Sequence, residues 1–206
     1  RLYGGDNMKL YHIHKPNQHD EYFQEGTILP AGSGINYFRG DFLNRSASYL
    51  KSTEEQDGKT IRHFDSISNL INVDTIREMT DEEKIKLVDM VYAYVRNSQT
   101  DIRELILEDV RIRKFRERPS RYKCMWLADE KSLNKWLRIL YKEQYDVFKV
   151  DVDGKLFKSS NSMLPDPTKS HSVMYDQAYT YWNATEEELS KKDDVEYLFE
   201  GEVKLK

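Results

Sequence analysis

The apolar positions in the middle of the chain repeat with the period of an α-helix. From Thr80 to Asn97 they recur at three- and four-residue spacing, at Ile85, Val88, Val91, Tyr92 and Val95. Thr80 and Glu83 stand in the capping-box arrangement, in which a hydroxyl and a carboxylate satisfy the first backbone N–H groups of a helix. The pattern therefore predicts a helix that begins at Thr80.

A second helical pattern follows a short polar break. Asn97 to Thr100 is expected to end the first helix, and the second begins near Asp101. It must end before Pro119, because the residue before a proline disfavours helical geometry. The side chains expected to face inward are Ile102, Leu105, Ile106, Val110 and Phe115. Together the two segments predict a helical hairpin packed on a sheet.

Strand patterns lie at both ends of the chain. The run from Met8 to Ile13 is aromatic and β-branched, and it stops near Pro16. The segment from Val195 to Leu205 is predicted as the last strand. On it, Glu196, Glu200 and Glu202 share one face, because alternate side chains of a strand point the same way.

The segment after Pro119 changes its period. Tyr122 to Ala128 indicates a buried strand, and Glu130 to Tyr141 returns to helical spacing. Asp153-Gly154 is a strong hairpin-turn dipeptide, so Val147 to Phe157 is predicted to form a hairpin.

The remaining segments give weaker patterns. They are a loop with short extended pieces from Gly26 to Gly34, a short helix from Asn44 to Lys51, an exposed turn from Glu54 to Lys59, a polar loop from Ser159 to Ser172, and a helix from Val173 to Ala184 with Tyr175, Ala178, Tyr179 and Trp182 on one side.

Composition places this pattern in one α+β domain. Of 206 residues, 32 are basic and 36 acidic, and the resulting formal charge of -4 does not by itself predict a nucleic-acid or membrane partner. Cys124 is the only cysteine, which favours a reducing, cytoplasmic location without disulfides. No apolar run approaches the roughly 18 residues of a membrane span. Residues 1–7 are interpreted as a tail, and 8–206 as the single domain.

Two histidines on the first strand are candidate ligands. His12 and His14 are two positions apart, so both imidazoles lie on one face and could bind a metal or a ligand. The alternative is a hydrogen-bonded core histidine beside a second one at the strand end. No further ligand motif accompanies them, so no metal is predicted. Cys124 lies within a strand, which argues against a catalytic thiol.

A basic segment interrupts the acidic chain between the second helix and the next strand. It carries Arg111, Arg113, Lys114, Arg116, Arg118, Arg121 and Lys123. Such a cluster could bind a pyrophosphate or the backbone of RNA or DNA, with Phe115 and Tyr122 available for stacking. The alternative is a solvated helix end, where cations complement the helix dipole.

Three stretches together resemble a known family. They are Leu10-Tyr11-His12-Ile13-His14 followed by Gly26, Pro119-Ser120-Arg121 followed by a strand and the helix near Trp136, and Tyr181-Trp182 followed by Val195-Glu196-Tyr197-Leu198. Their order is similar to that in a group of bacterial and phage proteins related to the ADP-ribosyltransferase fold. The resemblance implies two small sheets that form a cleft for NAD, and transfer of ADP-ribose with release of nicotinamide.

The resemblance also implies roles for individual residues. His12 would contact the ribose or nicotinamide side of NAD, and His14 stands where the family has a threonine. Ser120 or Tyr122 would lie beside the nicotinamide, with Arg121 as a phosphate partner. Glu196 would stabilise the positive charge that develops on the ribose. Glu202, in Glu200-Gly201-Glu202, is the alternative carboxylate, because this spacing resembles the Glu-x-Glu of the arginine-modifying branch.

The leading hypothesis is therefore an NAD-dependent ADP-ribosyltransferase, or an NAD glycohydrolase, that modifies a nucleic acid or protein, as a toxin or in phage defence. The basic residues Arg111, Arg113, Lys114, Arg116 and Arg118 would select RNA, DNA or protein as the acceptor. A nucleotide- or nucleic-acid-binding module without turnover is the second hypothesis. A toxin or antitoxin partner protein that needs no NAD is the third.

Overall fold

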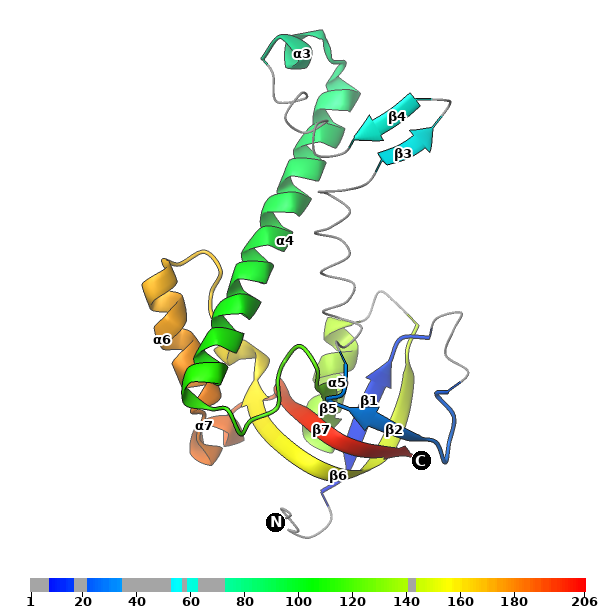
Figure 1. Cartoon of the computed structure of the whole chain (residues 1–206), viewed down its shortest axis with the longest axis vertical. Coiled ribbons are helices and arrows are strands. Elements are labelled where there is room, and N and C mark those ends of the chain that lie inside the picture. Colours follow the sequence, from blue (N-terminus) through cyan, green and yellow to red (C-terminus); the bar gives the residue numbers. More distant parts are fainter. Residues whose placement is uncertain (1–7, 17–21, 35–52, 57–58, 63–72, 141–143) are drawn as a thin grey trace. The chain divides into compact units, whose positions relative to one another are not determined.

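The computed structural model describes residues 8–16, 22–34, 53–56, 59–62, 73–140 and 144–206 (Figure 1). The chain divides into two compact units. The first combines residues 1–36 with residues 103–206, and the second comprises residues 37–102. The predicted tail, residues 1–7, and the predicted short helix, residues 44–51, lie outside the described residues.

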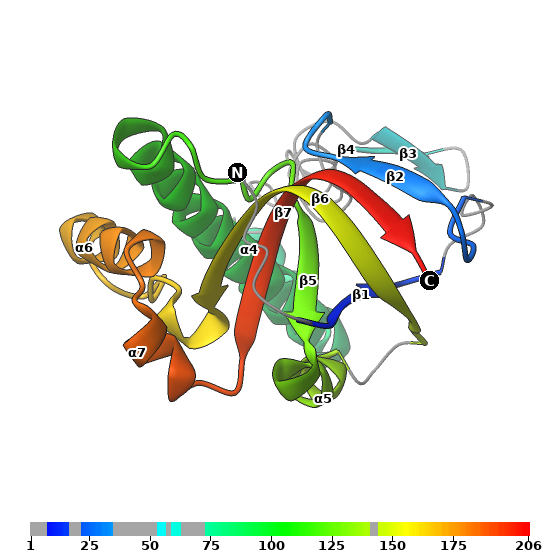
Figure 2. The ribbon, with the colours of Figure 1, turned by 90° about the horizontal axis from the view of Figure 1, so that it is seen from below.

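The first unit is built on a five-stranded antiparallel sheet. Its strands are β1 (Leu10–His14), β2 (Ile28–Ala31), β5 (Met125–Asp129), β6 (Asp146–Ser160) and β7 (Val195–Leu205). They lie in the order β2-β7-β5-β1-β6, and β6 also pairs with β7. The strands β7, β5, β1 and β6 therefore form a closed ring. Figure 2 shows how the long strand β6 curves past β7. The predicted first and last strands are confirmed, and β5 begins three residues later than predicted.

The predicted hairpin at Asp153-Gly154 is wrong. β6 runs without a turn from Asp146 to Ser160, pairing first with β1 and then with β7. Gly154 lies opposite Gly201. A Cβ atom on Gly154 would stand 2.2 Å from the Glu200 carbonyl oxygen, and one on Gly201 would stand 2.3 Å from that of Asp153. These glycines allow two strands to approach closely, which is a second use of glycine in strands.

The two faces of the ring bury different cores. Because side chains alternate along a strand, neighbouring residues of β7 point to opposite faces. One core gathers inside the ring, from all four strands: Leu10, Leu127, Val150, Val195, Tyr197, Phe199, Val203 and Leu205. The other lies outside it, where Phe157 and Leu198 pack against helical residues, among them Leu107, Met174, Ala178, Tyr181 and Trp182. A side chain on one face of the ring is thus separated by the sheet from a side chain on the other.

The long helix α4 (Asp81–Lys114) is continuous, so the predicted break at Asn97 to Thr100 and the helical hairpin are wrong. Its predicted start is confirmed. The Thr80 N–H donates to the Glu83 carboxylate at 2.8 Å, and the Glu83 N–H donates to the Thr80 hydroxyl at 3.3 Å. Thr100 is accommodated because its hydroxyl donates back to the Arg96 carbonyl, at 3.1 Å, inside the helix.

The last turns of α4 belong to the first unit and cover the outer core together with α6 (His171–Trp182). Of the predicted inward side chains, Ile106, Val110 and Phe115 are buried, whereas Ile102 and Leu105 are exposed. In α6 the buried face is Met174, Ala178, Tyr181 and Trp182, while the predicted Tyr175 and Tyr179 are exposed.

The other helices of this unit are short. The helix predicted from Glu130 to Tyr141 is confirmed as α5 (Glu130–Ile139). Asp129 caps it, because its side chain accepts from the Ser132 N–H at 2.7 Å. A single 3-10 turn, η1 (Asn161–Met163), lies in the predicted polar loop, and α7 (Glu186–Ser190) precedes β7.

The second unit contains the hairpin of β3 (Thr53–Gln56) and β4 (Lys59–Arg62), the helix α3 (Val73–Glu78) and the first part of α4. Residues 54–56, predicted as part of an exposed turn, are therefore strand. Among the described residues of the whole chain, no helix is long and apolar enough to cross a membrane.

Candidate functional site

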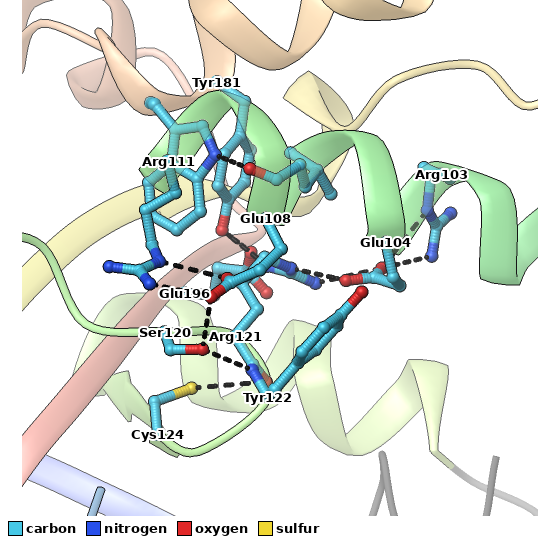
Figure 3. Close-up of polar contacts among 12 residues, drawn as sticks. Arg103, Glu104, Glu108, Arg111, Ser120, Arg121, Tyr122, Cys124, Tyr181 and Glu196 are labelled. Carbon is cyan, nitrogen blue, oxygen red and sulfur yellow. Dashed lines mark hydrogen bonds and ion pairs between the residues drawn. The ribbon is translucent and has the colours of Figure 1, made fainter. Parts of the chain in front are cut away.

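A buried arginine, Arg121, joins four elements of the first unit. The segment between α4 and β5 carries Arg121 and Ser120, α4 carries Glu104, α6 carries Tyr181, and β7 carries Glu196. Figure 3 shows these side chains converging on the outer face of the ring, with Arg121 at the centre. Two of the three stretches that resemble the ADP-ribosyltransferase group thus meet here.

Arg121 contacts two carboxylates at once. Its Nε donates to Glu104 Oε2 at 2.8 Å, and its Nη1 donates to Glu196 Oε1 at 2.6 Å. The side chains of all three residues are only 4% exposed. Tyr181 completes the group, since its hydroxyl accepts from Arg121 Nη1 at 2.5 Å and donates to Glu196 Oε1. We call Glu104, Arg121, Tyr181 and Glu196 the Arg121 network.

Opposite charges offset the effect of burial on the pKa values of Glu104 and Arg121. Burial alone would raise the pKa of Glu104, but the charges of Arg121 and Arg103 outweigh it and lower that pKa below its ordinary value. Burial would likewise lower the pKa of Arg121, but Glu104 and Glu196 raise it instead. Burial raises the pKa of Tyr181 far above its usual value, so this hydroxyl keeps its proton. The network is therefore a charged cluster that excludes water.

Ser120 ties the same segment to β7 and α4. Its N–H donates to Glu200 Oε1 at 2.7 Å, and its hydroxyl donates to Glu108 Oε1 at 3.0 Å. Glu108 is also held by Arg111, at 2.7 and 3.0 Å. The Tyr122 N–H donates to the Ser120 hydroxyl at 3.2 Å, which places Tyr122 beside Ser120, as Figure 3 shows. Ser120 is therefore held by Glu200 and Glu108, whereas its neighbour Arg121 makes the contact with Glu196.

The segment is compact because it folds back on itself after Pro119. The Cys124 N–H donates to the Ser120 carbonyl at 2.8 Å. The Arg118 guanidinium lies over the Phe115 ring at 4.5 Å and the Phe157 ring at 4.6 Å, which are cation–π distances. Cys124 is 1% exposed, and burial raises the pKa of its thiol well above the ordinary value. Each contact fixes the backbone on either side of Arg121.

The two histidines predicted as ligands lie on the inner face of the ring. His12 pairs with Phe148 across β1 and β6, and it shares a face with Leu10 of the inner core. His12 Nδ1 lies 3.0 Å from the Trp126 carbonyl, and the His14 ring stacks on Phe23 at 3.6 Å. Burial lowers the pKa of His12 to about 4, so the imidazole is neutral at pH 7. Among the described residues, no three His, Cys, Asp or Glu form a metal-binding group.

The sheet separates these histidines from the predicted carboxylate. Glu196 alternates along β7 with Val195 and Tyr197, both in the inner core, so its own side chain points outward. The structure therefore brings Arg121 to Glu196 and Ser120 to Glu200 of the same strand, but it places His12 and His14 on the other face of the ring. Glu202, the alternative carboxylate, is exposed on β7 and lies opposite Pro30 and Asp153.

The basic segment is largely engaged in internal contacts. Arg111 pairs with Glu108, Arg113 pairs with Asp109 at 2.8 Å, and Arg116 Nε donates to the Ile112 carbonyl at 2.7 Å. Arg118 is held between two rings, as above, while Lys114 is exposed. Arg113 and Arg116 are exposed, as in the solvated-helix-end alternative, whereas the Arg111 side chain is only 14% exposed. Nucleic-acid binding by Arg111, Arg113, Lys114, Arg116 and Arg118 stays a prediction.

Sequence reasoning missed Glu104 as a member of the site. Glu104 lies three residues before Leu107, on the helix face that carries the outer core, and it is 3% exposed. A carboxylate among inward-facing positions signals a buried cationic partner, because an unpaired buried charge is costly. Tyr181 lies within one of the stretches that carry the resemblance, yet no local pattern distinguished its hydroxyl from those of its neighbours.

The fold and the network define a class: an α+β protein with a closed ring of four strands and a buried arginine that bridges two carboxylates. The sequence matches the family described as "Protein of unknown function (DUF2441)" over residues 10–206, so the chain belongs to this family. The match spans both compact units. No curated protein matches the chain.

Proposed function

We propose that the protein is an NAD-dependent ADP-ribosyltransferase in which Glu196 acts on the ribose next to the nicotinamide. The observation that carries the proposal is the contact between Arg121 and Glu196, 2.6 Å long, across 75 positions of sequence. It joins two of the stretches that resemble the ADP-ribosyltransferase group. The group's arrangement of two sheets around a cleft for NAD is part of the proposal.

The chemistry supports a fixed carboxylate at this position. Cleavage of the bond between ribose and nicotinamide leaves positive charge on the sugar, and a preorganised anion lowers that barrier. Arg121 and Tyr181 both bind Glu196 Oε1, so one oxygen of the carboxylate is oriented by the protein. The other oxygen, Oε2, would face the ribose.

NAD has to displace part of the network to reach this carboxylate, because Glu196 is 3% exposed. The segment from Phe115 to Cys124 contacts β7 through Ser120 at Glu200 and through Arg121 at Glu196. A pyrophosphate would compete with Glu196 for Arg121, since a guanidinium binds phosphate and carboxylate by the same paired geometry. In the proposal, Arg121 holds the carboxylate in the free protein and the phosphates in the complex.

His12 and His14 face the interior of the ring and have no part in the step at Glu196. A role for either histidine in binding NAD stays a prediction. It would require NAD to contact the inner face of the ring as well as the outer face that carries Glu196. In the proposal, Ser120 or Tyr122 lies beside the nicotinamide of bound NAD. The acceptor is a macromolecule, protein or nucleic acid.

The test is nicotinamide release from NAD by the wild type, Glu196→Gln and Glu202→Gln, with cell lysate as a source of acceptors. Glu202 is the matched control, because it lies on the same face of β7 but is exposed. We expect turnover by the wild type and Glu202→Gln, and a loss of at least about a hundredfold in Glu196→Gln, the size expected for one lost electrostatic partner.

Thermal unfolding of each variant separates loss of chemistry from loss of structure. The proposal holds if Glu196→Gln is folded at the assay temperature and inactive. A folded Glu196→Gln with wild-type turnover, or a wild type that releases no nicotinamide and binds no NAD, rules it out.

A further inference from the structure

The first part of α4, which belongs to the second unit, exposes an apolar stripe. The sequence predicted that this segment is one arm of a helical hairpin packed on a sheet. In the structure Ile85, Val88 and Tyr92 are 63%, 65% and 66% exposed, and Val95 and Ile102 are 46% and 38% exposed. Single exposed apolar residues are ordinary, but a contiguous stripe indicates an interaction surface.

The stripe has the spacing of a coiled-coil seam. Ile85, Tyr92 and Gln99 are seven residues apart and occupy one core position of a heptad, whereas Val88, Val95 and Ile102 occupy the other. We call these six residues the α4 seam. A repeat of seven residues keeps a seam on one side of two supercoiled helices, so the pattern suits a partner helix.

The helix itself is longer than helices in globular proteins usually are. α4 spans 34 residues, whereas the average is about 11–12. Helices in water gain most of their stability from packing an apolar face. On α4 residues 81–102, Leu87 is buried, whereas the five apolar residues of the seam are exposed and Gln99 is half-buried. Pairing with a second helix would bury the seam.

We propose that the α4 seam pairs with the α4 seam of a second copy of this chain, parallel and in register. Charge supports this occupant. Lys84 and Asp89 flank the seam at the two positions that face each other across a parallel dimer, so Lys84 of one copy meets Asp89 of the other. In the single chain Lys84 forms an ion pair with Asp81 at 3.6 Å, and the Lys84 side chain is 41% exposed. Such exposed pairs are weak, so Lys84 can exchange Asp81 for Asp89 of the second copy.

Gln99 supports the register. It is the one polar residue of the seam, and a polar side chain at a core position favours the register in which it meets its own counterpart. In a parallel, in-register pair the two Gln99 amides can donate to and accept from each other. Any shifted register would place each amide against an apolar side chain, which is unfavourable.

Disulfide trapping in the full-length protein tests the arrangement. Symmetry brings each core position beside its own counterpart only in a parallel, in-register pair, so Val88→Cys should form a disulfide-linked dimer under mild oxidation. Lys86→Cys is the matched control, because Lys86 is 70% exposed and points away from the seam. The wild type is the second control, since its own Cys124 is 1% exposed.

The expected result is a covalent dimer from Val88→Cys, with no more than background from Lys86→Cys and the wild type. No cross-link from Val88→Cys, together with a monomer by sedimentation at rising protein concentration, overturns the proposal and means that the seam is covered by another partner. A non-covalent dimer that Val88→Cys fails to trap overturns it equally, because the helices are then antiparallel or out of register.

A charged substitution provides an independent readout. Tyr92→Glu would place two carboxylates against each other in the seam, and we expect the dimer to dissociate at least about tenfold more readily. Met90→Glu adds the same charge on the opposite side of the helix and should leave the dimer unchanged. Equal effects of both substitutions would contradict the α4 seam as the contact.

Discussion

Replacing Arg121 with methionine should strongly destabilise the first unit. The change leaves two carboxylates that are 4% exposed without their shared cation. Breaking a buried ion pair by removing one partner costs about 3–5 kcal/mol. Glu104 keeps Arg103 at 3.0 Å and Glu196 keeps the Tyr181 hydroxyl, so the two losses do not add in full. We expect a loss of about 4 kcal/mol, a large part of the 5–15 kcal/mol by which domains are stable.

Urea unfolding followed by tryptophan fluorescence measures this loss in the right unit. All three tryptophans, Trp126, Trp136 and Trp182, belong to residues 103–206. With a slope of about 2–3 kcal/mol per molar urea, the unfolding midpoint of Arg121→Met should fall by roughly 1–2 M. Arg113→Met is the matched control, because the Arg113 side chain is 69% exposed and its pair with Asp109 should contribute at most about 1 kcal/mol.

The loss should also depend on pH. The pKa of Glu104 is lowered in the folded protein, so its ion pair stabilises the wild type above the ordinary glutamate pKa, and this stabilisation is lost as the pH falls through the lowered value. In Arg121→Met the Glu104 carboxylate loses the larger of its two cationic partners and takes up a proton more readily. The difference between the two proteins is therefore largest near pH 7–8 and shrinks toward about pH 4. An Arg121→Met midpoint within experimental error of Arg113→Met at pH 7.5 would contradict a stabilising role for the buried ion pairs.

Three further outcomes are expected. Gly154→Ala should lower the free energy of unfolding by about 1–3 kcal/mol, and with it the unfolding temperature, because the added Cβ would stand 2.2 Å from the Glu200 carbonyl oxygen. Gly34→Ala is the control and should leave the unfolding temperature unchanged, because a Cβ at Gly34 would meet open space. Equal effects of the two substitutions would contradict the close strand approach. The His12 imidazole should stay neutral from pH 8 to 5 in an NMR titration. Because its pKa of about 4 in the folded protein lies below 6.5, the unfolded value, its contribution to stability is complete above pH 6.5 and is lost as the pH falls toward 4. Protonation near pH 6.5 in the folded protein would contradict its burial. Cys124 should react with a thiol reagent at pH 8 only after urea unfolds the chain, because burial raises the pKa of its thiol; rapid reaction of the native protein would show an open segment.

Local patterns predicted the elements whose packing agrees with their sequence. β1, α5 and β7 were found because their apolar periods and capping residues act over a few positions. Asp153-Gly154 was misinterpreted because glycine serves both turns and close strand contacts, and only the pairing with Gly201, far along the chain, decides between them. The polar run at Asn97 to Thr100 was misinterpreted because helix-breaking tendencies of Asn and Thr are small beside the cooperativity of a long helix.

The candidate site was predictable only in part for the same reason. Arg121 and Glu196 were named from motifs, and the structure brings them together. Glu104 and Tyr181 lie 17 and 60 positions from Arg121, and no periodicity encodes such a contact. The face of the ring on which His12 lies follows from the register of β1 against β6, which the sequence alone does not fix.

Hydrogen–deuterium exchange of the wild type with and without NAD tests the proposed site most directly, because it needs no substitution in a buried network. We expect NAD to change the exchange of the segment from Phe115 to Cys124 and of β7 around Glu196, since Arg121 must replace one partner by another. Unchanged exchange of both segments at saturating NAD, or a change confined to other parts of the chain, would contradict the assignment of this site to NAD.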